Sequence, residues 1–96
     1  MKQPLDPFFQ NKLRLSVMSI LMTNREVAFL YLCEQTDATD EEMNEQLELL
    51  EQKGYITTMR AFFGKCPRKS CTIEPKGEQV FLDYIETLEE HLKEEK

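Results

Sequence analysis

The chain has 96 residues, of which 41% are hydrophobic and 31% are charged, and its formal net charge is −6. This length fits one domain, and the negative total argues against undirected binding to a polyanion, although a local basic patch can outweigh it. Because no apolar run approaches the roughly 18–20 residues that cross a bilayer and no signal peptide is apparent, we expect one cytoplasmic domain over residues 1–96.

The first predicted element is a helix from Asp6 to about Met22. Asp6 is a typical N-cap, and Pro7 fits the first helical position. The pattern then indicates one continuous helix, since apolar residues recur at helical spacing at Leu13, Val17, Ile20 and Leu21.

A second helix is expected from about Glu26 to Gln35. Its spacing predicts that one side of this helix is buried. The residues assigned to that side are Phe29, Leu30, Leu32 and Cys33.

A third helix is expected to begin at Thr39, which forms a capping box with Glu42 three residues later. Its apolar stripe consists of Met43, Leu47 and Leu50, and a left-handed Gly54 is expected to end it. Two helices joined by a short turn, over about 26–53, form a helix-turn-helix arrangement.

Residues 55–73 are predicted to form a β-hairpin with a positively charged turn. The run 55–62 is rich in β-branched and aromatic residues, Gly64 and Pro67 interrupt it, and residues 71–73 can return as a second strand. No acidic residue lies between Gly54 and Ile73. We interpret the hairpin as a surface that contacts an anion, through the cations Arg60, Lys65, Arg68 and Lys69.

A final helix is expected over about 75–95. Its apolar residues Phe81, Ile85, Leu88 and Leu92 are spaced by 4, 3 and 4 residues, which is typical of a short coiled-coil seam. Tyr84 widens this stripe. We expect the stripe to pack against a second copy in a homodimer, together with Phe8 and Phe9. The alternative is that the stripe folds back onto the first helix of the same chain.

Three cysteines make a disulfide framework improbable, because their number is odd. Cys33 lies in an apolar run and is expected to pack as a small hydrophobic residue. Cys66 and Cys71 flank the expected turn, so they are candidates for a redox switch or half of a metal site. Since zinc sites usually take four Cys or His ligands and His91 is the only histidine, we expect neither metal nor cofactor.

No pattern typical of an enzyme is present. The sequence contains no nucleophile–base pair at a recognisable spacing, no glycine-rich phosphate loop and no cluster of metal ligands. We therefore expect a protein without catalytic activity.

From Asp6 to Leu92 the chain resembles the small single-domain winged-helix transcriptional regulators related to the MarR and ArsR groups. The resemblance implies a mainly α fold with a small β-hairpin wing, a winged helix-turn-helix with an added C-terminal dimerisation helix. It also implies a homodimer that binds double-stranded DNA, with recognition helices 39–53 in successive major grooves and Arg68 and Lys69 on phosphate or in the minor groove. The stretches that carry the resemblance are Asn11–Leu21, Leu47–Ile56 and Gly64–Ser70, followed by Ile73–Gly77.

The third helix departs from this pattern because its exposed face is acidic. Between Asp40 and Lys53, six acidic residues accompany one lysine, so DNA phosphates would meet like charge. Acids in the first turn favour the helix dipole, whereas capping does not explain Glu45 and Glu48. The positions expected to face a groove are Glu41, Glu42, Asn44, Glu45, Gln46, Glu48 and Leu49.

Of these positions, Asn44 and Gln46 are the candidates for base contact, since amide side chains can pair with adenine. The acidic helix also suggests an alternative function. In that function the winged-helix fold is a protein-interaction module that sets helix 40–51 against a basic protein partner, with DNA binding weak or lost. A third hypothesis is a ligand or redox sensor that acts through the dimer interface.

Overall fold

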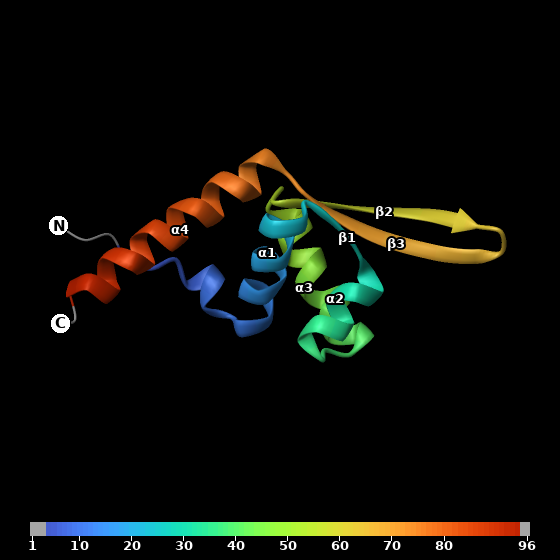
Figure 1. Ribbon diagram of the computed structural model, residues 1–96, viewed down its shortest axis with the longest axis horizontal. Helices are drawn as coiled ribbons and strands as arrows, with labels where there is room; N and C mark the ends of the chain where they lie inside the picture. Colours follow the sequence, from blue (N-terminus) through green and yellow to red (C-terminus); the bar gives the residue numbers. More distant parts are fainter. Residues whose placement is uncertain (1–3, 95–96) are drawn as a thin grey trace.

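Three helices form a cluster from which a long hairpin and a long helix project (Figure 1). The computed structural model describes residues 4–94 and extends over 54 × 25 × 21 Å. The elements follow in the order η1 (Pro7–Gln10), α1 (Lys12–Asn24), β1 (Glu26–Ala28), α2 (Phe29–Thr36), α3 (Asp40–Gln52), β2 (Ile56–Phe63), β3 (Cys66–Ile73) and α4 (Pro75–Glu94). Within residues 4–94, no helix is both long enough and apolar enough to span a membrane.

The first predicted helix is divided into two segments. Asp6 caps as expected, since its carboxylate accepts a hydrogen bond from the Phe8 amide at 3.0 Å, but the 3₁₀ helix η1 ends at Gln10. Asn11 then caps α1 by accepting from the Arg14 amide at 2.9 Å. The prediction of one continuous helix is wrong. In a continuous helix the Arg14 amide would donate to a backbone carbonyl, whereas here it donates to the Asn11 side chain, so a new helix begins at this point.

The second predicted helix begins later than expected. Residues 26–28 form β1, which pairs antiparallel with β3, and Val27 lies opposite Cys71. Helix α2 therefore starts only at Phe29, and this shift changes which residues it buries. Leu32 is buried as predicted, whereas Leu30 is 65% exposed and its assignment to the buried side is wrong.

Helix α3 agrees with its prediction at both ends. The Glu42 amide donates to Thr39 Oγ1 at 3.1 Å, and the Thr39 amide donates to Glu42 Oε1 at 2.9 Å, which completes the capping box. These hydrogen bonds to Thr39 lower the pKa of the Glu42 carboxyl. At the other end, Gly54 has φ 79°, and the Tyr55 amide donates to the Leu50 carbonyl at 3.1 Å in a Schellman arrangement.

Strands β2 and β3 form a longer hairpin than the sequence predicts. They pair over eight positions, from Ile56 opposite Ile73 to Phe63 opposite Cys66, and only Gly64 and Lys65 form the turn. Gly64 has φ 65°, which two-residue hairpin turns require. Pro67 lies within β3 instead of interrupting it, because β1 pairs with β3 only at residues 70–72 and leaves the outer edge at Pro67 unpaired. We call this hairpin the wing.

The hairpin geometry separates two of the cysteines. Cys66 and Cys71 lie on the same strand, five positions apart and on opposite faces, so roughly 16 Å of strand separates them. A disulfide needs Cα atoms within about 7 Å, so this geometry does not support the candidate redox pair or shared metal site at these two residues. Burial also raises the pKa of the Cys71 thiol to about 11, which keeps it protonated at neutral pH.

The core continues from the helix cluster into α4 through aromatic side chains. The Phe9 ring lies 5.9 Å from that of Tyr55, 5.6 Å from that of Phe81 and 5.2 Å from that of Tyr84, measured between ring centroids. Phe9, Phe81 and Tyr84 are all buried within the single chain. Their assignment to a dimer interface is wrong, because α4 folds back onto η1 of its own chain.

The start of α4 is fixed against the end of α3. The Glu74 amide donates to the Tyr55 carbonyl at 2.9 Å. A Cβ atom at Gly77 would overlap that same carbonyl group, so the close approach of α4 depends on glycine there. This contact sets the direction in which α4 leaves the helix cluster.

Candidate nucleic-acid interface

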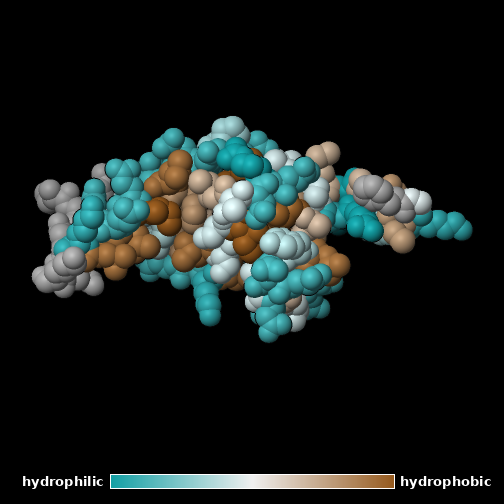
Figure 2. Space-filling view, viewed as in Figure 1, coloured by the Kyte–Doolittle hydropathy of each residue, from teal (hydrophilic) through white to brown (hydrophobic). Residues whose placement is uncertain are grey.

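The wing carries the predicted cations on an arm that projects from the helices (Figure 1). Arg60 lies directly opposite Lys69, so these two side chains share one face of the hairpin, while Arg68 lies on the other face. Lys65 occupies the turn. Arg60, Lys65 and Arg68 are exposed and Lys69 is half-buried. Figure 2 shows hydrophilic side chains at the far end of this arm.

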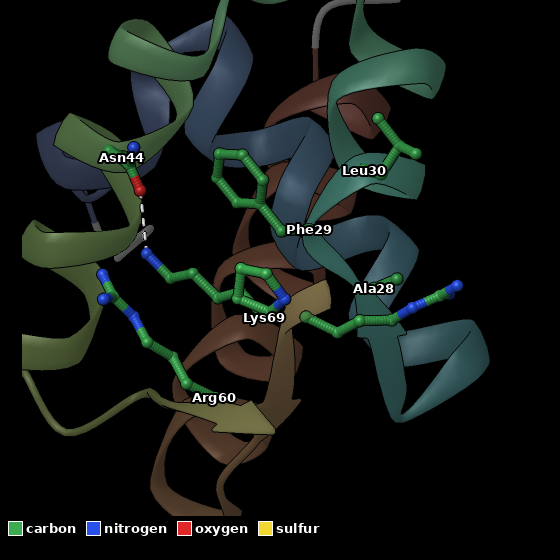
Figure 3. Close-up of a pocket in the computed structure, with 8 residues that line it drawn as sticks. Ala28, Phe29, Leu30, Asn44, Arg60 and Lys69 are labelled. Atoms are coloured by element: carbon green, nitrogen blue, oxygen red, sulfur yellow. Dashed lines mark hydrogen bonds between the residues drawn. The ribbon is translucent and has the colours of Figure 1, made fainter. Parts of the chain in front are cut away.

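Lys69 joins the middle of the wing to α3. It shares its strand face with the buried residues Cys71 and Ile73, so its side chain points toward the helices. Lys69 Nζ donates to Asn44 Oδ1 at 2.8 Å and lies 5.2 Å from the centroid of the Phe29 ring (Figure 3). The structure thus brings together Asn44, Lys69 and Arg60 around one pocket, which Arg68 also borders.

Gln46 is placed differently from Asn44. It is buried, and its Oε1 accepts a hydrogen bond from Arg14 Nε at 2.9 Å. Gln46 follows Met43 by three residues and therefore lies on the inner side of α3, against α1. The prediction that Gln46 faces a DNA groove is wrong, and Asn44 remains the candidate for base contact.

Three of the six acidic residues on α3 have partners inside the chain. Glu42 completes the capping box, Glu51 Oε1 accepts from Thr58 Oγ1 at 3.0 Å, and Asp40 Oδ1 lies 3.8 Å from Cys33 Sγ. The remaining three are Glu41, Glu45 and Glu48. They are exposed and have neither a side-chain hydrogen bond nor an ion pair within residues 4–94. The outer face of α3 is therefore acidic around Asn44.

Part of the apolar stripe on α4 remains uncovered in the single chain. Phe8, Ile85 and Leu88 are partly buried, and Leu92 is 58% exposed. Figure 2 shows apolar surface along α4. Of the residues assigned to a dimer interface, these four are accessible to a partner.

Sequence reasoning missed two residues beside the wing cations. Phe29 and Leu30, in the first turn of α2, lie next to Lys69 and Arg60. The sequence places both on a buried helix face, because it does not reveal that residues 26–28 form a strand. The only available signal was Val27, a β-branched residue, and three residues are too few to show the alternation of a strand.

Comparison with known proteins agrees with this architecture. A family model described as a winged helix DNA-binding domain matches residues 13–92. No curated protein is significantly similar to the chain.

Solved structures with the same fold include several regulators. A transcriptional regulator homologue from Pyrococcus horikoshii OT3 has a TM-score of 0.85 and 20% identity, over 92% of this chain and 87% of that chain. Stf76 from the Sulfolobus islandicus plasmid-virus pSSVx has a TM-score of 0.63 and 20% identity, over 77% of this chain and 96% of that chain. Bacillus subtilis PadR, solved in complex with operator DNA, has a TM-score of 0.68 and 18% identity, over 78% of this chain and 48% of that chain.

These findings confirm both the predicted fold class and the resemblance to small winged-helix transcriptional regulators. The family model covers most of the chain, including the helix-turn-helix, the wing and nearly all of α4. The chain belongs to the winged helix DNA-binding domain family.

Proposed function

We propose that the protein is a DNA-binding transcriptional regulator that acts as a homodimer. In this proposal α3 faces the major groove and the wing cations contact the phosphate backbone. The supporting observation is the wing, which carries four cations and no carboxylate on a chain whose net charge is −6. A basic arm on an acidic domain concentrates attraction for a polyanion at one place.

Asn44 is the proposed base-reading residue. An asparagine that reads adenine uses both its carbonyl oxygen and its amino group. In the free protein, the carbonyl oxygen accepts a hydrogen bond from Lys69. We therefore propose that Lys69 turns to a phosphate when DNA binds, which releases Asn44 to pair with a base.

The acidic face of α3 supports a second candidate function. Glu41, Glu45 and Glu48 would repel nearby phosphates, and intrachain hydrogen bonding does not account for them. In this candidate, the same face binds a basic protein partner. The two candidates differ in whether duplex DNA is retained at all.

Selection from a pool of random duplexes separates the two candidates. At low salt we expect the protein to retain DNA, and the enriched duplexes should bind with a dissociation constant of about 1 µM or tighter. Enriched duplexes should share a sequence motif, since backbone contacts alone select none. If no duplex is retained at low salt, DNA binding is contradicted and the protein-partner function is favoured.

The homodimer has a separate test at Leu92. Replacing Leu92 by glutamate places a charge within the exposed apolar stripe of α4, so it should shift a dimer toward monomer with little effect on the fold. Sedimentation at tens of micromolar should show a wild-type dimer and a largely monomeric Leu92→Glu variant. Leu30→Glu is the matched control, because Leu30 is similarly exposed, at 65% against 58% for Leu92, but lies on α2. Wild-type protein that sediments as a monomer would rule out this proposed assembly.

A further inference from the structure

Phe62 is an exposed aromatic residue near the end of the wing. It is 73% exposed and lies directly opposite Pro67 in the hairpin. The turn of Gly64 and Lys65 begins two residues later, so Phe62 belongs to the part of the wing that projects beyond the helices (Figure 1). Packing within the domain therefore does not account for a phenylalanine at this position.

Two cations lie on either side of this ring along the chain. Arg60 is on the same face of β2, two positions from Phe62, which is roughly 7 Å along the strand. Lys65 lies on the other side, in the turn. In the part of the chain that the structure describes, neither cation has a side-chain hydrogen bond or an ion pair. Both charges are therefore available to a ligand that also covers the ring.

An exposed ring between cations has the chemistry of a site for single-stranded nucleic acid. Unpaired bases stack on aromatic side chains, while neighbouring cations contact the phosphates. The bases of a duplex are already paired and stacked, so extruding one onto the ring would cost free energy. Neither strand of the wing carries a carboxylate, so no side chain of the wing opposes the phosphates.

The acidic face of α3 also favours a single strand over a duplex as the ligand of this ring. Glu41, Glu45 and Glu48 would repel the phosphates of a duplex that lies against α3. A flexible single strand can contact the end of the wing without approaching α3, because the wing extends away from the helices (Figure 1).

The side chains around Phe62 favour DNA over RNA. Phe62 and Pro67 are apolar, and the side chains of Arg60 and Lys65 contain only donors. None of these four side chains can accept a hydrogen bond from a ribose 2′-hydroxyl group. The apolar pair would remove that hydroxyl from water without replacing its hydrogen bond.

We propose that the outer wing, defined as Arg60, Phe62, Lys65 and Pro67, binds single-stranded DNA. A base stacks on the Phe62 ring, and Arg60 and Lys65 contact the phosphates on either side of it. This activity goes beyond the proposed recognition of duplex DNA, because it requires neither α3 nor a second copy of the chain.

The direct test uses Phe62→Trp, because the chain contains no tryptophan of its own. The full-length variant is titrated at low salt with an oligothymidylate of about 12 nucleotides, which is within the site sizes of single-strand binders. Stacking of a thymine on the indole should quench its fluorescence, and the quenching should saturate.

Met59→Trp is the matched control for this titration. Met59 is 60% exposed on the same strand but lies on the opposite face of the hairpin, so the fluorescence of this variant should not change. Equal quenching in the two variants, or quenching that does not saturate, would overturn the proposal.

Truncation measures how much the ring contributes to affinity. Phe62→Ala should weaken oligothymidylate binding about tenfold, which is typical for the loss of one base–aromatic stack. Met59→Ala should leave the affinity unchanged. Both side chains are exposed, so neither variant should disturb the fold. Wild-type affinity in Phe62→Ala would refute stacking on this ring.

Changes to the ligand test the base, the charge and the sugar separately. An abasic oligomer of the same length keeps the phosphates and should bind about tenfold more weakly. Polyglutamate of equal charge should also bind more weakly than oligothymidylate. If the abasic oligomer bound as tightly as oligothymidylate, base stacking would be refuted, and if polyglutamate did, an acidic protein partner would replace single-stranded DNA. Oligodeoxyuridylate should bind more tightly than oligouridylate, and equal or tighter binding of the RNA would contradict the assignment to DNA.

These experiments fail or succeed independently of the proposed function. If selection retains no duplex, the regulator function fails, while the oligothymidylate titration still decides whether the outer wing binds a single strand. If a selected duplex is bound and oligothymidylate is not, single-strand binding is refuted and the regulator function stands.

Discussion

Replacing Phe9 by alanine is expected to lower the free energy of unfolding by about 3–5 kcal/mol. The Phe9 side chain is fully buried, and its ring contacts those of Tyr55, Phe81 and Tyr84. Truncation would leave a cavity beneath α4 as well as removing apolar burial. This loss is a large part of the about 5–15 kcal/mol that stabilises a typical domain. Since each 1 kcal/mol shifts the midpoint of thermal unfolding of a domain of this size by about 4–8 °C, the midpoint should fall by about 12–40 °C.

Phe62→Ala is the matched control for this experiment. It makes the same chemical change at a side chain that is 73% exposed on the wing, so we expect an effect within about 0.5 kcal/mol. Both variants can be compared by urea and thermal unfolding of the full chain. If Phe9→Ala cost no more than Phe62→Ala, the packing of η1 beneath α4 would be refuted.

Removing three wing cations is expected to weaken duplex binding about a hundredfold near 0.1 M salt. The variant combines Arg60→Gln, Lys65→Gln and Arg68→Gln. Each lost phosphate contact should reduce the slope of log K against log[salt] by about 0.9, and three such contacts together give a loss of this size. Titration of one selected duplex over a series of salt concentrations measures both the affinity and the slope.

A second triple variant tests whether the position of the charges matters. Lys12→Gln, Lys76→Gln and Lys93→Gln remove the same total charge from α1 and α4, outside the wing. We expect this variant to retain most of the wild-type affinity and slope. Equal losses in the two variants would show that total charge controls binding, and would remove the wing from its proposed role.

The parts of the fold that the sequence predicts well are those set by local signals. Thr39, Glu42 and Gly54 define α3 because a capping box and a left-handed glycine act within a few residues. The presence of a basic hairpin is also predictable from the sequence, since its charge and its strand-like composition are properties of one continuous segment. Two of the stretches that carry the family resemblance, Leu47–Ile56 and Gly64–Ser70, lie largely in these elements.

The parts that the sequence does not predict depend on distant partners. Strand β1 exists because residues 26–28 pair with residues 70–72, and a run of three residues contains no reliable strand signal. Helical periodicity identifies Phe81 and Tyr84 as apolar, but it does not say whether η1 or a second copy covers them. Gln46 was assigned outward for a similar reason, because its partner Arg14 lies on α1.

The structure also reduces the number of acidic residues on α3 that oppose DNA binding by the basic wing. Capping and intrachain hydrogen bonds account for Glu42 and Glu51, and Asp40 lies beside Cys33. The charge that DNA would meet is thus concentrated in Glu41, Glu45 and Glu48, close to Asn44. We infer that DNA affinity depends strongly on the wing. The acidic face of α3 would repel the phosphates, whereas a helix with a basic face would attract them.

The most direct test of this account is the salt dependence of duplex binding by the wild-type protein, measured with a selected duplex from low to moderate ionic strength. We predict binding at low salt and a linear fall of log K with log[salt], with a slope of about −3 or steeper for wing cations that displace counterions. Absence of binding at low salt, or affinity that does not change with salt, would contradict a wing that binds the phosphate backbone.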